Sequence, residues 1–323
     1  YLAHPETRSE LIPLTRIQTL MVEPLVAAMR SFLGPRLQCG VDIARIEIND
    51  SGFASYDRQQ RLRAVSENLL FCCGAIETPL PEVIALHDRW EGSMQFLSRD
   101  TLEGLPDTSG PVVIIGASHS AFSCAWRLLH DPLFAEFSRD REILILQRRE
   151  GIKLRCTPDF AAAHQIDYDP VTDVCPRTGL VFFHGGLRKD AKFLYIDIRD
   201  GRENRVRLVQ LDRLGEQQAV LDQAGLILQA TGFNANLPRI EQDSVEVRVG
   251  SPTRNGELRN LDTGEIIPGL FGMGLGLNIL PDGEPRGEQS FSGGVHGFQS
   301  YPLAVAPRII DRLKAEMPMG VRS

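Results

Sequence analysis

Two kinds of hydrophobic pattern follow one another along the chain. Residues 14–33 place apolar side chains at helical spacing, and we expect Pro24 to end or kink a turn there. Shorter runs with polar punctuation come next and predict a small antiparallel meander, at 41–48, 52–57 and 61–73. Residues 74–83 contain Gly and Pro and predict a loop that leaves this meander.

Continuous apolar runs take over after Pro111. Residues 112–116 are almost wholly apolar and end in glycine, which is typical of a strand buried on both faces. A helix is predicted at 119–130 and a second buried strand at 142–147, so a βαβ unit begins here. Further strands are predicted at 180–184, 192–198, 205–211, 225–230 and 269–274, and a closing helix near 302–315.

The turn between the first buried strand and its helix has the composition of a phosphate site. A pyrophosphate needs backbone N–H groups at a helix N-terminus and no side chain in the way. The segment IIGASHSA offers a glycine for the turn, and it has small residues, serine and alanine, where the usual G-x-G-x-x-G fingerprint has its later glycines. We therefore predict a dinucleotide site at Gly116, Ala117, Ser118, His119, Ser120 and Ala121. The alternative is a structural turn in which serine caps the helix.

The end of the second buried strand indicates which dinucleotide is bound. NAD sites usually place an acidic residue there to accept from the ribose 2′-hydroxyl. Here Arg148 and Arg149 follow Gln147, and guanidinium groups suit a 2′-phosphate. The sequence therefore favours NADPH over NADH, with a solvated charged loop as the alternative reading.

Composition and charge remove several classes of function. The chain has 323 residues, 42% hydrophobic and 24% charged, with a net charge of -7, so we expect a small-molecule substrate and no nucleic acid. No apolar run is long enough to span a membrane, so no membrane partner is expected. The six cysteines form no C-x-x-C pair, which favours a reduced, cytoplasmic protein, and we expect Cys72 and Cys73 to be buried thiols.

Two kinds of catalytic site are not indicated. The seven histidines are dispersed without metal-ligand spacing, so no metal is expected. The segment GASHSAF departs from the G-x-S-x-G of serine hydrolases, because no glycine stands at the last position of that pattern.

Five segments resemble the flavin-containing monooxygenase-like group, which includes N-hydroxylating and Baeyer–Villiger enzymes. They are GASHSA, ILQRRE and QATGFNANLP, with the tail segments 269–276 and 293–310. The resemblance implies an α/β fold of two Rossmann-like, three-layer domains, in which an FAD-type domain is interrupted by an NADPH-binding domain. It implies FAD-type parts at 1–106 and 228–323 around an NADP-binding domain at 107–227.

The resemblance also implies which residues meet the flavin. The A-T-G-F element at 230–233 marks the return to the FAD-type domain, and 68–79 would be the matching exit, with Cys-Cys-Gly in place of Ala-Thr-Gly. The cofactor-binding residues implied are Thr231, Gly232, Phe233, Gly274, Gly294 and Val295. His296 is the catalytic candidate and would hydrogen-bond flavin, an oxygenated intermediate or substrate, although a lone histidine can be structural. Asn278 and Gln299 are further candidates of this kind.

Two departures from the group keep alternatives open. No G-x-G-x-x-G turn for the FAD pyrophosphate precedes residue 111, and the chain starts with Tyr1, so we expect either an N-terminally incomplete chain or a lost half-site. The F-x-G-x-x-x-H-x-x-x-W signature is not found cleanly, since His87, Trp90 and Ser93 have other spacing.

Three functions follow from this reading. The first is an NADPH-dependent flavoprotein oxidoreductase of the monooxygenase kind, which passes hydride from NADPH to FAD and activates oxygen on a small organic substrate. The second is an NADP-binding protein without flavin. The third is a single-domain dehydrogenase, for which no Tyr-x-x-x-Lys pair is found.

Overall fold

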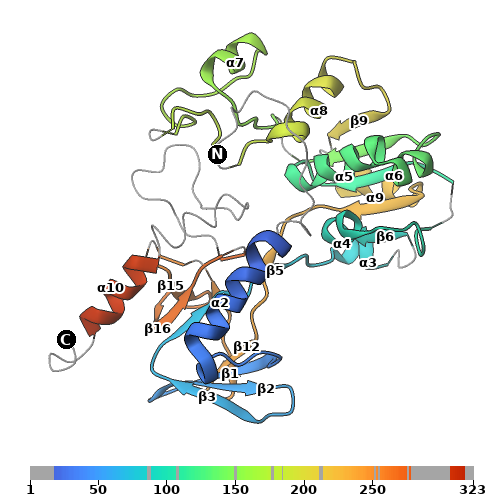
Figure 1. Cartoon of the computed structure of the whole chain (residues 1–323). Coiled ribbons are helices and arrows are strands. Elements are labelled where there is room, and N and C mark those ends of the chain that lie inside the picture. Colours follow the sequence, from blue (N-terminus) through green and yellow to red (C-terminus); the bar gives the residue numbers. More distant parts are fainter. Residues whose placement is uncertain are drawn as a thin grey trace. The chain divides into compact units, whose positions relative to one another are not determined.

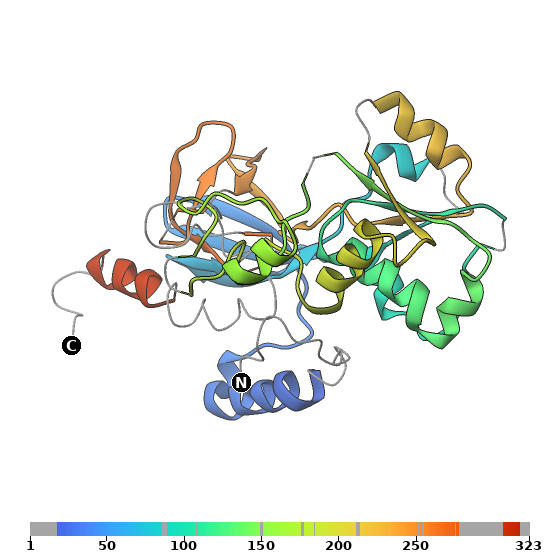
Figure 2. The same ribbon diagram turned by 90° about the horizontal axis from the view of Figure 1, so that it is seen from above.

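The chain folds into two compact units of mixed α/β structure, so the α/β class is confirmed. The computed structural model describes residues 18–85, 89–106, 109–148, 151–175, 178–183, 185–210, 214–250, 252–253, 255–274, 276–277 and 306–316. Unit 1 comprises Tyr1–Arg8, Cys73–Asn236 and Gly274–Leu303, and unit 2 comprises Ser9–Cys72, Leu237–Met273 and Ala304–Ser323. Figures 1 and 2 show the elements of both units.

Unit 1 is built on a five-stranded parallel sheet with the order β6-β10-β7-β8-β9. The strands are β6 (Trp90–Gly92), β7 (Val112–Ile115), β8 (Ile143–Gln147), β9 (Val206–Gln210) and β10 (Leu226–Gln229). From β7 the chain moves outward to β8 and β9, and it then returns to the other side of β7 with β10. This is the 3-2-1-4 order of nucleotide-binding doubly wound sheets, and its direction reverses between β7 and β10.

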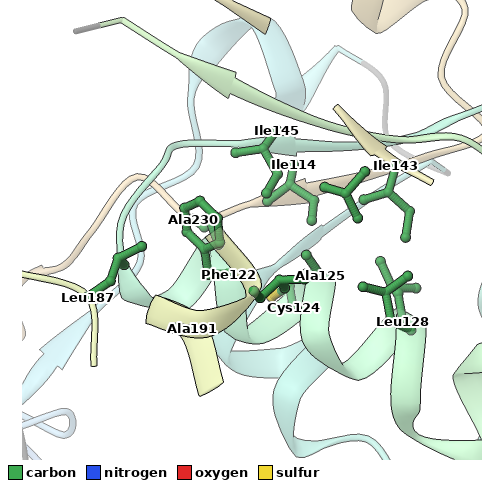
Figure 3. Close-up of a cluster of buried hydrophobic side chains, with 14 of the residues drawn as sticks. Ile114, Phe122, Cys124, Ala125, Leu128, Ile143, Ile145, Leu187, Ala191 and Ala230 are labelled. Atoms are coloured by element: carbon green, nitrogen blue, oxygen red, sulfur yellow. The ribbon is translucent and has the colours of Figure 1, made fainter. Parts of the chain in front are cut away.

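Helices cover both faces of this sheet, because its central strands are apolar on both sides. On one face lie α4 (Ser93–Ser98), α5 (His119–His130), α6 (Pro132–Phe137), α8 (Lys189–Arg199) and the segment that contains α7 (Pro158–Ala163). On the other lie α3 (Pro81–Ile84) and α9 (Leu214–Asp222). Figure 3 shows Ile114 and Ile145 of the sheet packed towards Phe122 and Ala125 of α5. Burying each isoleucine contributes about 1.5–3 kcal/mol, which fixes this face against the sheet.

Three sequence predictions are wrong. Residues 192–198 form part of helix α8, because a parallel β8–β9 pair needs a crossover between its strands. Residues 180–183 form a turn with isolated bridges only, since Phe182 adopts a φ of 44°. Cys72 and Cys73 are exposed, because they follow β4 (Leu69–Phe71), the edge strand of its sheet.

Unit 2 contains the predicted meander, formed by β1 (Ile43–Asn49), β2 (Gly52–Asp57) and β3 (Leu62–Ser66). β12 (Arg239–Gln242) joins β1 in parallel, and β13 (Val245–Glu246) closes the five-stranded sheet. A second sheet has the order β14-β15-β16-β4, with β14 (Val249–Gly250), β15 (Glu257–Asn260) and β16 (Ile266–Gly272). The described residues of unit 2 do not show the second Rossmann-like domain that the resemblance implies, so this domain stays a prediction.

The helices of unit 2 lie near the ends of the chain. A π-helical turn (Gln18–Val22) leads into α2 (Glu23–Leu33), and a 3-10 turn (Gly34–Arg36) follows. Pro24 lies in the first turn of α2, so the break expected at this proline marks the start of the α-helix. The closing helix α10 (Ala306–Glu316) buries Ile309, which packs close to Gly256.

The two units exchange the chain at other points than the sequence indicated. Within the described residues the chain passes from one unit to the other after residues 72, 236 and 273, whereas the predicted boundaries follow 106 and 227. The difference arises because β6 pairs with β10 and α4 packs on the same sheet, so residues 73–106 belong to unit 1. A short antiparallel pair, β5 (Ala75–Ile76) with β11 (Asn234–Ala235), brings the exit and the return of the chain together.

Candidate functional site

The point where the strand order reverses lies at the carboxyl ends of β7 and β10. Gly116 follows β7 with a φ of 110°, and its N–H donates to the Leu146 carbonyl at 3.0 Å. A Cβ added to Gly116 would stand 2.4 Å from the Ala230 carbonyl oxygen. The Ala230 N–H in turn donates to the Ile115 carbonyl at 2.8 Å. Glycine is therefore required here by the close approach of two strand ends, at the crevice where such sheets bind ligands.

Helix α5 starts at this crevice with open backbone donors. Ser118 is the N-cap residue, but its side chain makes no capping hydrogen bond. By contrast, Asp131 caps α6 and Thr157 caps α7 through their side chains. Ser118 and His119 are exposed, so the first N–H groups of α5 face solvent with the positive end of the helix dipole. The serine-cap alternative lacks the side-chain bond that it requires, and anion binding at this helix start stays a prediction.

The end of β8 supplies the next part of the site. Arg148 is exposed at the residue after β8, on the carboxyl edge of the same sheet. The Oε1 atom of Gln147 is buried and has no hydrogen-bond partner among the residues that the structure describes. A carbonyl acceptor in that state fits a ligand hydroxyl or amide donor.

His119, the first residue of α5, is neutral at pH 7. Loss of hydration lowers the pKa of its imidazole to about 4, and the positive charge of Arg188 acts in the same direction. The residue still has an exposed edge, so its ring can offer one N–H and one acceptor nitrogen to a ligand.

The return segment lies against the same turn. Thr231 and Gly232 are exposed directly after Ala230, and the Thr231 hydroxyl accepts a hydrogen bond from the Gln229 side chain at 3.0 Å. Residues 116–121 and 231–233, more than a hundred positions apart in the sequence, therefore come together at one edge of unit 1.

Comparison with known proteins finds a curated relative over part of the chain. No family model matches the chain. A curated relative, the CMP-5'-(3-aminopropyl)phosphonate hydroxylase of Streptomyces rubellomurinus, is 26% identical over 219 residues, which is 64% of this chain and 50% of the relative. The chain thus spans about half the length of the curated relative that it matches.

Three solved structures are similar to this chain at low sequence identity. The ornithine hydroxylase of Pseudomonas aeruginosa is 13% identical, with a TM-score of 0.48 over 90% of this chain and 74% of that one. A flavin-containing monooxygenase from Stenotrophomonas maltophilia is 14% identical, with a TM-score of 0.46 over the same shares. A bacillithiol disulfide reductase from Staphylococcus aureus is 12% identical, with a TM-score of 0.43 over 92% and 77%. The chain is similar to oxidoreductases of the hydroxylase and monooxygenase kind, which agrees with the motifs in its sequence.

Several predicted site residues lie outside the described part of the chain. They are Arg149, Gly294, Val295, His296, Asn278 and Gln299, together with His87 of the linker. Gly274 is described and has a φ of 112°, and its carbonyl accepts from the N–H of buried Leu277 at 3.1 Å. Its predicted contact with flavin stays a prediction.

One important residue of this region is absent from the sequence predictions. Gln229 is 1% exposed, and its side chain accepts from the Leu80 N–H and donates to the Thr78 carbonyl, both at 2.8 Å. These bonds tie the exit segment to the end of β10 beside the candidate site. The signal was an amide residue near the end of an otherwise apolar strand, where a polar side chain needs a partner.

Within the described residues, two further classes of site are not seen. No group of three His, Cys, Asp or Glu side chains that could hold a metal ion occurs there. Nor does that part of the chain contain a helix with the length and apolar character needed to cross a membrane.

Proposed function

We propose that unit 1 binds NADPH at the carboxyl edge of its parallel sheet. The observation that carries the proposal is the close approach of Gly116 to Ala230 beside the uncapped, exposed start of α5. The pyrophosphate would accept hydrogen bonds from the first N–H groups of α5, and Arg148 would pair with the 2′-phosphate. Arg149 would add a second guanidinium at the same strand end.

We propose that the whole protein is an NADPH-dependent flavoprotein oxidoreductase of the monooxygenase kind, acting on a small organic substrate in the cytoplasm. Bound FAD would accept hydride from NADPH and activate oxygen. The name of the curated relative favours hydroxylation over Baeyer–Villiger oxidation. The FAD-type domain and the flavin contacts of Thr231, Gly232, Phe233, Gly274, Gly294, Val295 and His296 belong to this proposal.

The described residues of unit 2 do not by themselves form a flavin site. There, no buried strand runs through a glycine turn into a helix as β7 runs into α5. The flavin half of the proposal therefore rests on the resemblance, and a flavin-free NADP-binding protein is the second candidate. The flavoprotein and the flavin-free candidate differ in whether the purified protein carries flavin.

The nucleotide proposal is tested by titrating the protein with NADPH and NADH. Arg148→Ala should weaken NADPH binding by about 1.5–3 kcal/mol, the range for hydrogen bonds to charged groups, and leave NADH binding unchanged. The change in the NADPH-to-NADH ratio of Kd is the measurement.

Arg207→Ala is the matched control, because Arg207 is 63% exposed and pairs with Glu142 near the amino end of β8. This change should leave both affinities unaltered. An unaltered NADPH affinity in the Arg148 variant would remove Arg148 from the site, and no NADPH binding by the unchanged protein would refute the proposal.

A further inference from the structure

A second basic side chain lies at the same edge of unit 1. Arg188 is the residue before α8, and α8 leads into a parallel strand, so its start lies at the carboxyl edge of the sheet, as the start of α5 does. Leu187, Ala191 and Phe122 belong to one buried cluster on this face (Figure 3). The rings of Phe122 and Tyr195 meet edge to face, with their centroids 6.0 Å apart. The starts of the two helices are thus held on one side of the sheet.

The turn before α8 fixes the position of Arg188. A Cβ on Gly186 would stand 2.3 Å from the backbone nitrogen of Arg155 and 2.7 Å from the Phe182 carbonyl oxygen. The Leu187 N–H donates to the Lys153 carbonyl at 2.8 Å, and its own carbonyl accepts from the Arg155 N–H at 2.9 Å. Arg188 therefore follows a turn that is packed backbone against backbone.

The charges in this turn run against the helix dipole. Arg188 and Lys189 stand at the positive end of α8, where anions are favoured. The Arg155 guanidinium stacks 4.2 Å from the Phe183 ring, and Arg188 donates to the Phe183 carbonyl at 3.4 Å, so a third cation joins the group. A group of positive charges at a helix start raises the local concentration of anions.

The start of α5 is within electrostatic reach of Arg188. Loss of hydration lowers the pKa of His119, the residue where α5 begins, and the positive charge of Arg188 acts in the same direction. Arg148 belongs instead to the end of β8, one strand further along the sheet.

We propose that Arg188 binds the pyrophosphate of the nucleotide, opposite the first N–H groups of α5, and takes no part in recognising the 2′-phosphate. This inference rests on the proposed NADPH function. It divides the phosphate contacts between two arginines, with Arg148 selecting NADPH over NADH and Arg188 binding both.

The experiment measures the Kd of NADPH and of NADH for the unchanged protein and for Arg188→Ala, Arg188→Gln, Arg188→Lys and Arg148→Ala. The neutral Arg188 variants should weaken both nucleotides by the same factor, about ten- to a hundredfold, since each nucleotide carries the pyrophosphate. Arg188→Lys should recover part of the affinity because it keeps the charge. Arg148→Ala should weaken NADPH alone, and Arg207→Ala should weaken neither.

Each other outcome overturns the inference. If the neutral Arg188 variants weaken only NADPH, Arg188 serves the 2′-phosphate. If they weaken neither nucleotide while Arg148→Ala still does, the inference falls and the proposed function stands. If the unchanged protein binds no nucleotide, both fall.

A readout without nucleotide shows whether the variants remain folded. Removing the Arg188 charge should raise the pKa of His119, followed by NMR titration of its ring. If Arg188→Ala loses the native spectrum, Arg188→Gln, which keeps most of the side-chain volume, decides the result.

Discussion

At the scale of single residues, Gly116 meets two demands at one position. Its φ of 110° is a conformation that side chains avoid, and the Ala230 carbonyl occupies the space that a Cβ would need. The same residue closes the strand-to-helix turn of the candidate nucleotide site. The stability of the fold and the proposed nucleotide binding therefore both depend on the absence of a Cβ atom at residue 116.

Gly116→Ala should lower the free energy of unfolding by about 2–4 kcal/mol, because backbone strain and overpacking add. Urea denaturation followed by circular dichroism measures the loss. Gly232→Ala is the matched control, since Gly232 has a φ of 100° but no heavy atom within 4 Å of the added Cβ. It should lose only about 1–2 kcal/mol, and equal losses for the two variants would show that the Ala230 contact is unimportant.

His119 should make stability depend on pH. Its pKa is about 4 in the folded chain against an ordinary 6.5, so between these values the unfolded chain binds more protons. Stability should therefore fall as pH falls from about 6.5 to about 4. His119→Gln should flatten this part of the profile, measured by urea denaturation at pH 7 and pH 5. An identical pH dependence in the variant would contradict the prediction.

Asp57 acts in a lower pH range and does not obscure this test. Burial acts to raise the pKa of its carboxyl, but hydrogen bonds from the Arg61 N–H and from the Arg63 and Arg61 side chains outweigh it and lower the value to about 2. Its contribution is present above an ordinary value of 3.8 and is lost only below that pH.

At the scale of elements, β7, β8 and α5 were predicted from the sequence to within a residue or so. Each of these segments has a hydrophobic pattern that fits one type of element. A short, continuous apolar run before a glycine fits a buried strand, and twelve residues with apolar side chains at helical spacing fit a helix. The positions of Arg148 and of the turn at 116–121 follow from the same patterns, and their roles in nucleotide binding stay a prediction.

Segments 192–198 and 180–184 show where local pattern fails. An apolar run of about seven residues fits a strand or a buried helix, and the crossover between parallel strands decides for the helix. The positive φ of Phe182 and the placing of Arg188 beside His119 depend on contacts between distant segments. No periodicity in the sequence carries that information.

Gln229 links two elements that are far apart in the sequence. Gln229→Leu should leave the Leu80 N–H and the Thr78 carbonyl without their partner and lower the free energy of unfolding by about 2–4 kcal/mol. Gln218→Leu is the control, because Gln218 is exposed on α9 and bonds only to Asp222 in the same helix. It should change stability by less than about 0.5 kcal/mol. Equal effects in urea denaturation would show that the Gln229 bonds contribute nothing specific.

At the scale of the whole molecule, the visible spectrum separates the two proposed functions. A flavoprotein should absorb in the blue when purified, and NADPH added without oxygen should bleach that band, because reduced flavin has lost the oxidised chromophore. A colourless protein that nevertheless binds NADPH would support the flavin-free candidate. Arg148→Ala should slow the bleaching by NADPH and leave the spectrum before addition unchanged.

The paired strands β5 and β11 have a consequence for how such a protein can evolve. The Asn236 N–H donates to the Gly74 carbonyl at 3.2 Å, so the inserted stretch begins and ends at neighbouring points. A segment with adjoining ends can be exchanged for another by recombination without stretching the host chain. The stretch 73–236, the longest part of unit 1, therefore fits onto any host loop whose two stems stand one hydrogen bond apart.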